Sequence, residues 1–178
     1  MIITISGKAG SGKSTVGKML AKRLNLKYYC IGDMRRKMAE ERGLSLEEFN
    51  KLGEKEDFTD KEVDSFQEKL GKKEDNFLIV GRTSYHFIPH SIKVFLDVNL
   101  DESARRIFCA QRENEHYASV DEALEKIKER EESDRSRYQK YYRINPFDHK
   151  NFDIVINTTE ISAVKVVEKI MQFVKEKK

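Results

Sequence analysis

The sequence has little cysteine, little proline and no tryptophan. Its two cysteines, Cys30 and Cys109, are too few for a disulfide framework, and neither they nor the four histidines show metal-ligand spacing. Two prolines and nine glycines disfavour a loop-rich or collagen-like chain. No apolar run approaches the ~18 residues of a membrane span, and the N-terminus reaches Gly7 too soon for a signal peptide. We therefore expect a cytoplasmic protein without a membrane partner.

The charge of the chain is large in amount but nearly balanced in sign. The sequence has 34 Lys and Arg against 31 Asp and Glu, which gives a net charge of +3. That excess is too mild to indicate a nucleic-acid partner, so we expect a mixed, solvated surface instead. A length of 178 residues predicts a single domain with a full core, and we expect a monomer.

Strand and helix patterns alternate along the chain. Short apolar runs predict strands over 2–6, 27–31, 77–80, 94–98 and 153–156. Helical patterns predict helices over 13–24, 34–42, 101–112 and 119–139, and a C-terminal helix with an apolar stripe from Val164 to Val174. Asp33 is expected to cap the helix over 34–42. A capping box of Ser45 and Glu48 opens a further helix, and Thr59 is expected to cap one that runs to about 71. This alternation predicts an α/β fold with a parallel sheet covered by helices on both faces.

Two charged helical stretches, 33–73 and 110–143, interrupt the alternation. Both have a low apolar content. We expect them to be insertions that cap the strand ends and contribute little to the core.

The motif G-x-x-x-x-G-K-S lies between the first predicted strand and the first predicted helix. Its residues are Gly7, Lys8, Ala9, Gly10, Ser11, Gly12, Lys13 and Ser14, and Thr15 follows. The glycines allow successive backbone N–H groups to turn toward phosphate oxygens, and the helix N-terminus adds its positive dipole. Lys13 is expected to reach the β- and γ-phosphates, and the Ser14 hydroxyl to ligate Mg²⁺. The motif predicts a site for a nucleoside triphosphate.

Four later segments resemble those of the short, archaeal-type cytidylate kinases, a family of P-loop nucleoside monophosphate (NMP) kinases. They are a Gly-Asp-Met-x-Arg segment within 31–36, a D-x-x-x-D-x-x-Q segment at 60–67, a strand ending in Gly-Arg at 77–82, and an R-E-x-x-D-x-x-R segment at 130–137. No N-K-x-D tetrapeptide, which a GTPase needs to bind guanine, occurs in the chain. The resemblance spans nearly the whole sequence.

The resemblance implies a P-loop NTPase fold, a three-layer sandwich with a five-stranded parallel sheet. The single domain would have a core of 1–32, 74–109 and 144–178, with an NMP-binding insertion near 33–73 and a short lid near 110–143. The implied reaction transfers the γ-phosphate of ATP, assisted by Mg²⁺, to CMP or dCMP. The nucleotides would be its partners.

Arginines are the expected charge-neutralising groups, because a planar guanidinium grips phosphate oxygens in pairs. The resemblance assigns the acceptor phosphate to Arg36 more than to Arg35, and Arg82 follows a buried-looking strand on the ligand side of an open sheet. Arg82 would otherwise be a surface cation at a strand end.

The predicted helix over 119–139 carries a further set of candidates. Arg130, Asp134 and Arg137 are spaced i, i+4 and i+7 and share one face, and Arg135 lies about 100° away from Asp134. We expect a catalytic lid, and the alternative is an ordinary ion-pair face. Arg106 and Arg112 are weaker lid candidates.

The sequence also offers candidate residues for the acceptor base and for the metal. Asp64 and Gln67, one turn apart, are candidates for reading a base, and an exposed polar helix face is an equal alternative. Many relatives carry an acid before the Gly-Arg pair that helps to organise Mg²⁺, but this chain has Val80 there. We therefore expect Asp33 to act on Mg²⁺ through water, beside Ser14. The alternatives are that the metal depends on Ser14 and the phosphates alone, or that Asp97, another acid at a strand end, takes part.

Two other functions remain open at this point. One is an adenylate or other small-acceptor kinase, although the chain lacks the longer G-F-P-R-T run of adenylate kinases. The other is an NTP-binding regulatory module with little turnover, which Val80 keeps under consideration. The sequence does not distinguish CMP, dCMP and UMP, nor does it identify the preferred donor.

Overall fold

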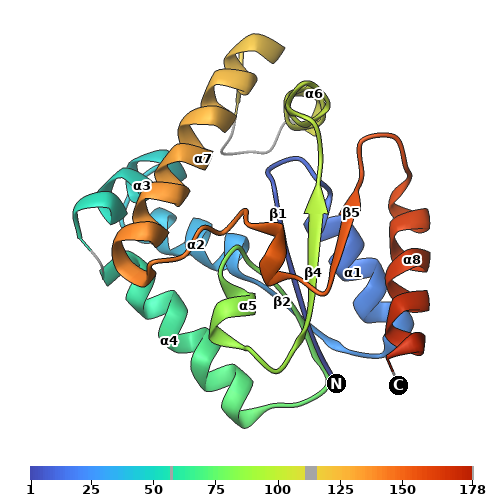
Figure 1. Ribbon diagram of the computed structural model, residues 1–178. Coiled ribbons are helices and arrows are strands. Elements are labelled where there is room, and N and C mark those ends of the chain that lie inside the picture. The colour runs from blue at the N-terminus through green and yellow to red at the C-terminus, as the bar shows by residue number, and fades with distance from the viewer. Residues whose placement is uncertain (57, 111–115, 178) are drawn as a thin grey trace.

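The structure is a computed structural model that describes residues 1–56, 58–110 and 116–177. A five-stranded parallel sheet lies at its centre, with the strand order β2-β3-β1-β4-β5 (Figure 1). The α/β three-layer architecture predicted from the sequence is therefore confirmed.

All five predicted strands are present; the bounds of β3 are as predicted, and those of the other four differ by one or two residues. They are β1 (Ile2–Gly7), β2 (Lys27–Cys30), β3 (Phe77–Val80), β4 (Ile92–Asp97) and β5 (Ile154–Asn157). Within the sheet β3 is buried along its whole length. This burial explains its unbroken apolar run, since a parallel strand between two helical layers has no solvated face.

The helices follow the predicted order. They are α1 (Lys13–Leu24), α2 (Ile31–Glu40), α3 (Leu46–Lys55), α4 (Phe58–Lys73), α5 (Ser84–Phe87), α6 (Leu100–Ala110), α7 (Val120–Tyr142) and α8 (Ala163–Glu176), with a 3₁₀ turn at His149–Asn151. The capping box of Ser45 and Glu48 is confirmed at the start of α3. Residues 111–115, which hold Arg112, the end of the helix expected over 101–112 and part of the expected lid, lie outside the described residues.

Two predicted helix caps are wrong. Asp33 lies in the first turn of α2, because β2 runs directly into the helix and Cys30 occupies the N-cap position. Thr59 lies inside α4 and is buried, so it does not terminate the helix against solvent. Short α5 and the 3₁₀ turn had no clear periodicity in the sequence and were not predicted.

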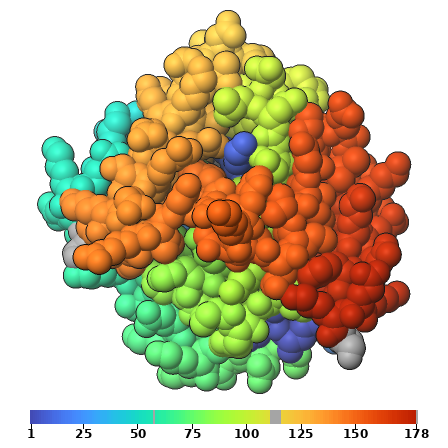
Figure 2. All heavy atoms as spheres, in the orientation of Figure 1, coloured from blue at the N-terminus to red at the C-terminus, as the bar shows by residue number. Residues whose placement is uncertain are grey.

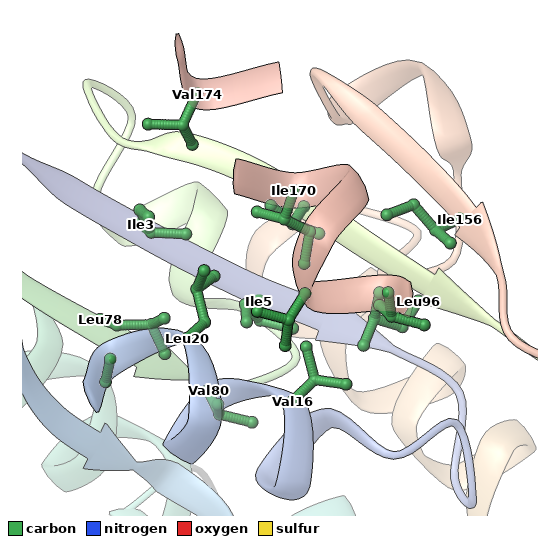
Figure 3. Close-up of a cluster of buried hydrophobic side chains, with 14 residues drawn as sticks. Ile3, Ile5, Val16, Leu20, Leu78, Val80, Leu96, Ile156, Ile170 and Val174 are labelled. Atoms are coloured by element: carbon green, nitrogen blue, oxygen red, sulfur yellow. The ribbon is translucent and has the colours of Figure 1, made fainter. Parts of the chain in front are cut away.

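Helices α1 and α8 cover one face of the sheet. Their apolar side chains pack against β1, β3, β4 and β5 in one cluster, in which Ile3, Ile5, Leu20 and Ile170 are fully buried (Figure 3). The predicted stripe on the C-terminal helix explains this packing, because Val167, Ile170 and Val174 of α8 all point into the cluster.

The opposite face corrects the expectation that residues 33–73 contribute little to the core. Met38 of α2, Phe49 of α3 and Val63 of α4 are buried together with Phe77 and Ile79 of the sheet. The few apolar residues of this segment are gathered on the sheet side, so a low average apolar content conceals a complete packing face.

The carboxyl ends of the strands meet at one edge of the sheet. Gly7 at the end of β1 pairs with Leu96 of β4, and Cys30 at the end of β2 pairs with Val80 of β3. Helices α6 and α7 and the loop after β1 form a third apolar cluster above this edge. Open parallel sheets bind ligands at this edge.

No helix among the described residues is long and apolar enough to cross a lipid bilayer.

The contact between α1 and β3 generates a test of the fold. A Cβ atom on Gly17 would lie 2.7 Å from Cγ2 of Val80 and 3.0 Å from Cε2 of Tyr28. We expect Gly17→Ala to lower the free energy of unfolding by about 1–3 kcal/mol, because overpacking outweighs the better helix propensity of alanine. Denaturant unfolding measures the change. Lys22→Ala on the exposed face of α1 is the control, and an unchanged or raised stability of Gly17→Ala would contradict the packing.

Candidate active site

The predicted phosphate loop bends as its glycines allow. Gly10 has φ +67° and Gly12, at the N-cap of α1, has φ +83°, both in the left-handed region. A Cβ on Gly10 would lie 2.8 Å from the carbonyl oxygen of Ser103, so only glycine fits against α6 there. The Ser103 hydroxyl donates to the carbonyl of Ala9 at 2.8 Å. Helix α6 therefore holds the loop from one side.

Two lysines of the loop have different partners. Lys13 Nζ donates a hydrogen bond to the carbonyl oxygen of Lys8, and thus lies across the loop that it is expected to serve. Lys8 Nζ forms an ion pair of 3.0 Å with Oδ1 of Asp97 at the end of β4. Asp97 therefore anchors the loop to the sheet through Lys8.

Arg106 of α6 ties three segments together. Its guanidinium donates to the carbonyl oxygens of Gly10, Thr158 and Thr159, and its Nε donates to Glu102 at 2.7 Å. These contacts place Arg106 at the phosphate loop and at the turn after β5, although the sequence suggested it only as a weak lid candidate.

A cavity lies between the phosphate loop, α2, α3 and α7. In the space-filling view, blue atoms of the N-terminal part of the chain show at the bottom of a recess between green and orange surfaces (Figure 2). The cavity is lined by eleven of the residues predicted for the site, namely Ala9, Gly10, Gly12, Lys13, Ser14, Thr15, Arg36, Arg82, Arg130, Asp134 and Arg137. The structure thus brings together the predicted donor loop and most of the predicted arginines.

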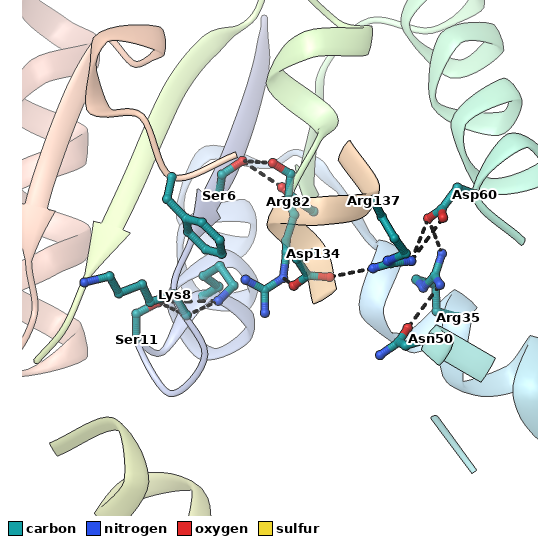
Figure 4. A network of polar contacts seen from close by, with 12 residues as sticks. Ser6, Lys8, Ser11, Arg35, Asn50, Asp60, Arg82, Asp134 and Arg137 are labelled. Atoms are coloured by element: carbon teal, nitrogen blue, oxygen red, sulfur yellow. Dashed lines mark hydrogen bonds and ion pairs between the residues drawn. The ribbon is translucent and has the colours of Figure 1, made fainter. Parts of the chain in front are cut away.

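A chain of buried ion pairs crosses one side of this cavity (Figure 4). Arg35 Nη1 lies 2.7 Å from Asp60 Oδ1, and Asp60 Oδ2 lies 3.0 Å from Arg137 Nη1. Arg137 then pairs with Asp134 at 2.5 Å, and Asp134 pairs with Arg82 at 2.6 Å. We call these five side chains the arginine–aspartate chain. It joins α2, α4, α7 and the turn after β3.

The arginine–aspartate chain has three cations and two anions. Burial would raise the pKa of Asp134, but the charges of Arg82, Arg137 and Arg130 together outweigh burial and lower it, which favours the ionised form of this carboxyl group. The five side chains therefore have one formal positive charge in excess, and they are largely buried. Moreover, Nη1 of Arg82 and Nε of Arg137 are buried and have no hydrogen-bond acceptor in the described part of the chain. An anionic ligand would satisfy both requirements.

Arg36 and Asp33 form a salt bridge with each other on α2. Burial opposes ionisation of Asp33, but the hydrogen bond and the charge of Arg36, together with Cys30 and Lys18, outweigh it and lower the pKa of Asp33. Arg36 lines the cavity, whereas Asp33 is half-exposed at its margin. Val80 belongs to the core cluster under α1 and also lines the cavity floor.

Asp64 and Gln67 are buried and are bonded to each other and to neighbours. Gln67 Nε2 donates to Asp64 Oδ1 at 2.9 Å, Ser84 Oγ donates to Gln67 Oε1 at 2.6 Å, and the Tyr142 hydroxyl donates to Asp64 Oδ2. The alternative of an exposed polar face is therefore wrong. Neither residue is among the described residues that line the cavity, so a contact with the base stays a prediction.

Phe147, after α7, lies between two arginines. The guanidinium carbons of Arg82 and Arg135 lie 5.4 and 5.7 Å from the centre of its ring. This cation–π contact is a second restraint on Arg82 besides its ion pair with Asp134. Arg135 does not line the cavity in the described residues, and its predicted substrate contact is likewise untested.

The phosphate loop at the carboxyl edge of a parallel sheet, with arginines facing it across a cavity, defines a P-loop protein of the small-kinase type. Solved structures share this fold. An uncharacterised protein from Eubacterium ventriosum matches with a TM-score of 0.73 at 20% identity, and shikimate kinase from Bacteroides thetaiotaomicron with 0.68 at 17%; each match covers 98% of both chains.

Sequence comparison narrows the class to a family. The model of the cytidylate kinase-like family matches residues 2–160. A cytidylate kinase from Methanobrevibacter smithii is 37% identical over 175 residues, covering 98% of this chain and 99% of that protein. One from Sulfurisphaera tokodaii is 39% identical over 178 residues, covering 97% and 96%. The chain belongs to the cytidylate kinase-like family, and the resemblance seen in the sequence is confirmed.

Sequence reasoning did not single out Asp60 and Asn50, and it ranked Arg35 below Arg36. Arg35 and Asp60 belong to the arginine–aspartate chain, and Asn50 accepts a hydrogen bond from Arg35 at 3.0 Å. Asp60 is the first aspartate of the D-x-x-x-D-x-x-Q segment, from which only Asp64 and Gln67 were predicted as site residues. For Asn50 the sequence offered no signal beyond a polar residue in a helix.

The buried Asp64 generates a prediction about pH and stability. Burial raises its pKa from the usual 3.8 to about 7. Between these two values the native state holds a proton that the unfolded chain has lost. The contribution of Asp64 to the unfolding free energy therefore falls as the pH rises from about 4 to about 7, by about 4 kcal/mol in total.

Chemical denaturation at pH 5, 6, 7 and 8 tests this prediction against Asp64→Asn. The wild-type protein should lose stability relative to the variant over that range, because the variant has no carboxyl group to ionise. A stability difference that stays constant from pH 5 to 8 would show that Asp64 has an ordinary pKa.

Proposed function

We propose that the protein transfers the γ-phosphate of ATP to CMP or dCMP and so forms ADP and CDP or dCDP. One observation carries this proposal: the phosphate loop and the buried group of Arg82, Asp134 and Arg137 line the same cavity. The chain also belongs to the cytidylate kinase-like family. The acceptor and the donor are both polyanions, and this cavity has an excess of cationic groups.

The donor triphosphate would bind at the loop of residues 7–14. The N-terminus of α1 points its backbone N–H groups at the loop, and Lys13 would exchange the Lys8 carbonyl for phosphate oxygens. Since a phosphate nucleophile has a second pKa near ~6, it is mostly ionised at pH 7 and needs no strong general base. The residues of this chain therefore act by positioning and by neutralising charge.

The residues present fit a magnesium ion held mainly by phosphate oxygens. Ser14 lines the cavity, and Asp33, whose pKa is lowered mainly by Arg36, would act on the ion through water. In the described residues there is no cluster of three or more acidic, histidine or cysteine side chains that would hold a metal alone. Magnesium, when bound, offsets charge on the phosphate oxygens.

The acceptor phosphate would lie between Arg36 and Arg82, with Arg130 above it from α7. Arg82 already has Asp134 on Nε and a buried Nη1 without an acceptor, so it can hold a phosphate while remaining oriented. We further propose that residues 33–73 form the NMP-binding insertion and 110–143 the lid. Closure of α7 over the cavity would exclude water and favour transfer to the acceptor over hydrolysis.

Removal of the two cations nearest the transferred group tests the mechanism. Lys13→Ala and Arg82→Ala should each lower kcat/KM by about a hundredfold or more, because each removes charge stabilisation of the transition state. Steady-state kinetics measures the loss, and circular dichroism checks the fold. Arg105→Ala, on the exposed side of α6, should keep full activity. A variant that retains more than about a tenth of activity, ~1.4 kcal/mol of barrier, would refute the role of that residue.

A panel of acceptors tests the reaction itself. Release of ADP from Mg-ATP should depend on CMP or dCMP and should be far slower with UMP, AMP, GMP or no acceptor. Turnover with AMP alone would place the protein with the adenylate kinases. ATP binding without acceptor-dependent turnover would instead identify a nucleotide-binding module.

A further inference from the structure

Asn50 of α3 lies on the cavity side of the arginine–aspartate chain, and nothing derived so far gives it a role. It is 9% exposed and lines the cavity. In Figure 4 the phosphate loop, marked by Lys8 and Ser11, lies on one side and Asn50 on the other, with Arg82 and Asp134 between them. Asn50 is therefore at the end of the site away from the donor phosphates.

The charge at this end of the cavity is already compensated. Arg35 and Arg137 are both paired with Asp60, and Arg137 also with Asp134. The other lining groups there are the side chain of Leu46 and the ring of Tyr138, both largely buried. Both guanidinium groups at this end already have carboxylate partners, so a flat, uncharged heterocycle suits this end better than a second phosphate does.

The orientation of the Asn50 amide is fixed by its neighbour. Arg35 Nη2 donates a hydrogen bond of 3.0 Å to Oδ1 of Asn50. A guanidinium has donors and no acceptor, so the amide oxygen must face Arg35 and the amide nitrogen must face away from it. Figure 4 shows the nitrogen of Asn50 on the side of the phosphate loop. Among the described residues no hydrogen-bond acceptor for Nδ2 is recorded. The Nδ2 amide group of Asn50 is therefore available as a hydrogen-bond donor to a ligand in the cavity.

We propose that Asn50 is a specificity-determining residue that donates a hydrogen bond from Nδ2 to N3 of the acceptor base. This inference rests on the proposed function and deepens it. Ring nitrogen N3 of cytosine carries a lone pair and accepts, whereas N3 of uracil carries a hydrogen. With UMP the two donors face each other, and the buried amide loses its partner. Arg35 sets the selection because it prevents the amide from turning over.

The test compares CMP with UMP in the full-length protein. Asn50→Asp keeps an oxygen toward Arg35 and presents a second oxygen to the base, so it should lower the ratio of kcat/KM for CMP to that for UMP by about tenfold or more. Asn50→Gln keeps the amide donor and should retain the preference for CMP. Lys51→Ala, an exposed neighbour on α3, should leave the ratio unchanged. The KM for ATP should stay constant in all variants.

Calorimetric binding of CMP and of UMP without ATP separates this inference from the proposed function. Binding that prefers CMP, and loses the preference in Asn50→Asp, supports the role of Asn50 even in a protein that shows no turnover. Equal losses for CMP and UMP in a folded Asn50→Asp variant would overturn it, and would reduce Asn50 to a support for Arg35. Wild-type binding without any preference for CMP would also overturn it.

Discussion

The ion pair between Asp60 and Arg137 is the contact on which the site depends. It joins residues 77 positions apart, both nearly without solvent exposure, and so fixes α7 to α4. Asp60 orients Arg35 on one side, and Arg137 orients Asp134 and, through it, Arg82 on the other. Helices α2, α4 and α7 and the end of β3 are thereby held in fixed positions relative to one another. Breaking a buried pair of this kind leaves uncompensated charge and is strongly destabilising.

Burying these charges costs desolvation free energy, and apolar residues of similar size often pack at least as stably. The value of the arginine–aspartate chain lies in what apolar packing cannot supply. The aspartates hold the guanidinium groups of Arg82 and Arg137 in place beforehand, so an arriving phosphate meets cations that are already oriented. The same pairs neutralise the far end of the cavity and leave it suited to an uncharged ring. Under the proposed function, one network would therefore separate the end of the cavity that binds phosphate from the end that binds the base.

The sequence predicted those parts of the structure that depend on local spacing. The phosphate loop was recognisable because its glycines and Lys13 have a fixed spacing, and Phe77–Val80 because a strand buried on both faces is continuously apolar. The helical face of Arg130, Asp134 and Arg137 was predicted as well. What the sequence could not give was the partner of each polar group. Arg35 and Arg36 differ by about 100° around α2, and only packing against α3 and α4 turns Arg35 inward. The burial of Asp64 is likewise set by distant Tyr142.

Helix α7 runs without interruption from Val120 to Tyr142. Four of its side chains belong to the site or its surroundings. Arg130 lines the cavity, Asp134 and Arg137 belong to the arginine–aspartate chain, and Tyr142 donates a hydrogen bond to Asp64. Each added or deleted residue in an α-helix turns everything beyond it by about 100° and shifts it by about 1.5 Å. A deletion between Arg130 and Tyr142 would therefore turn the groups on one side of it away from those on the other side. We therefore expect α7 to tolerate a substitution on its exposed face better than a change in its length between Val120 and Tyr142.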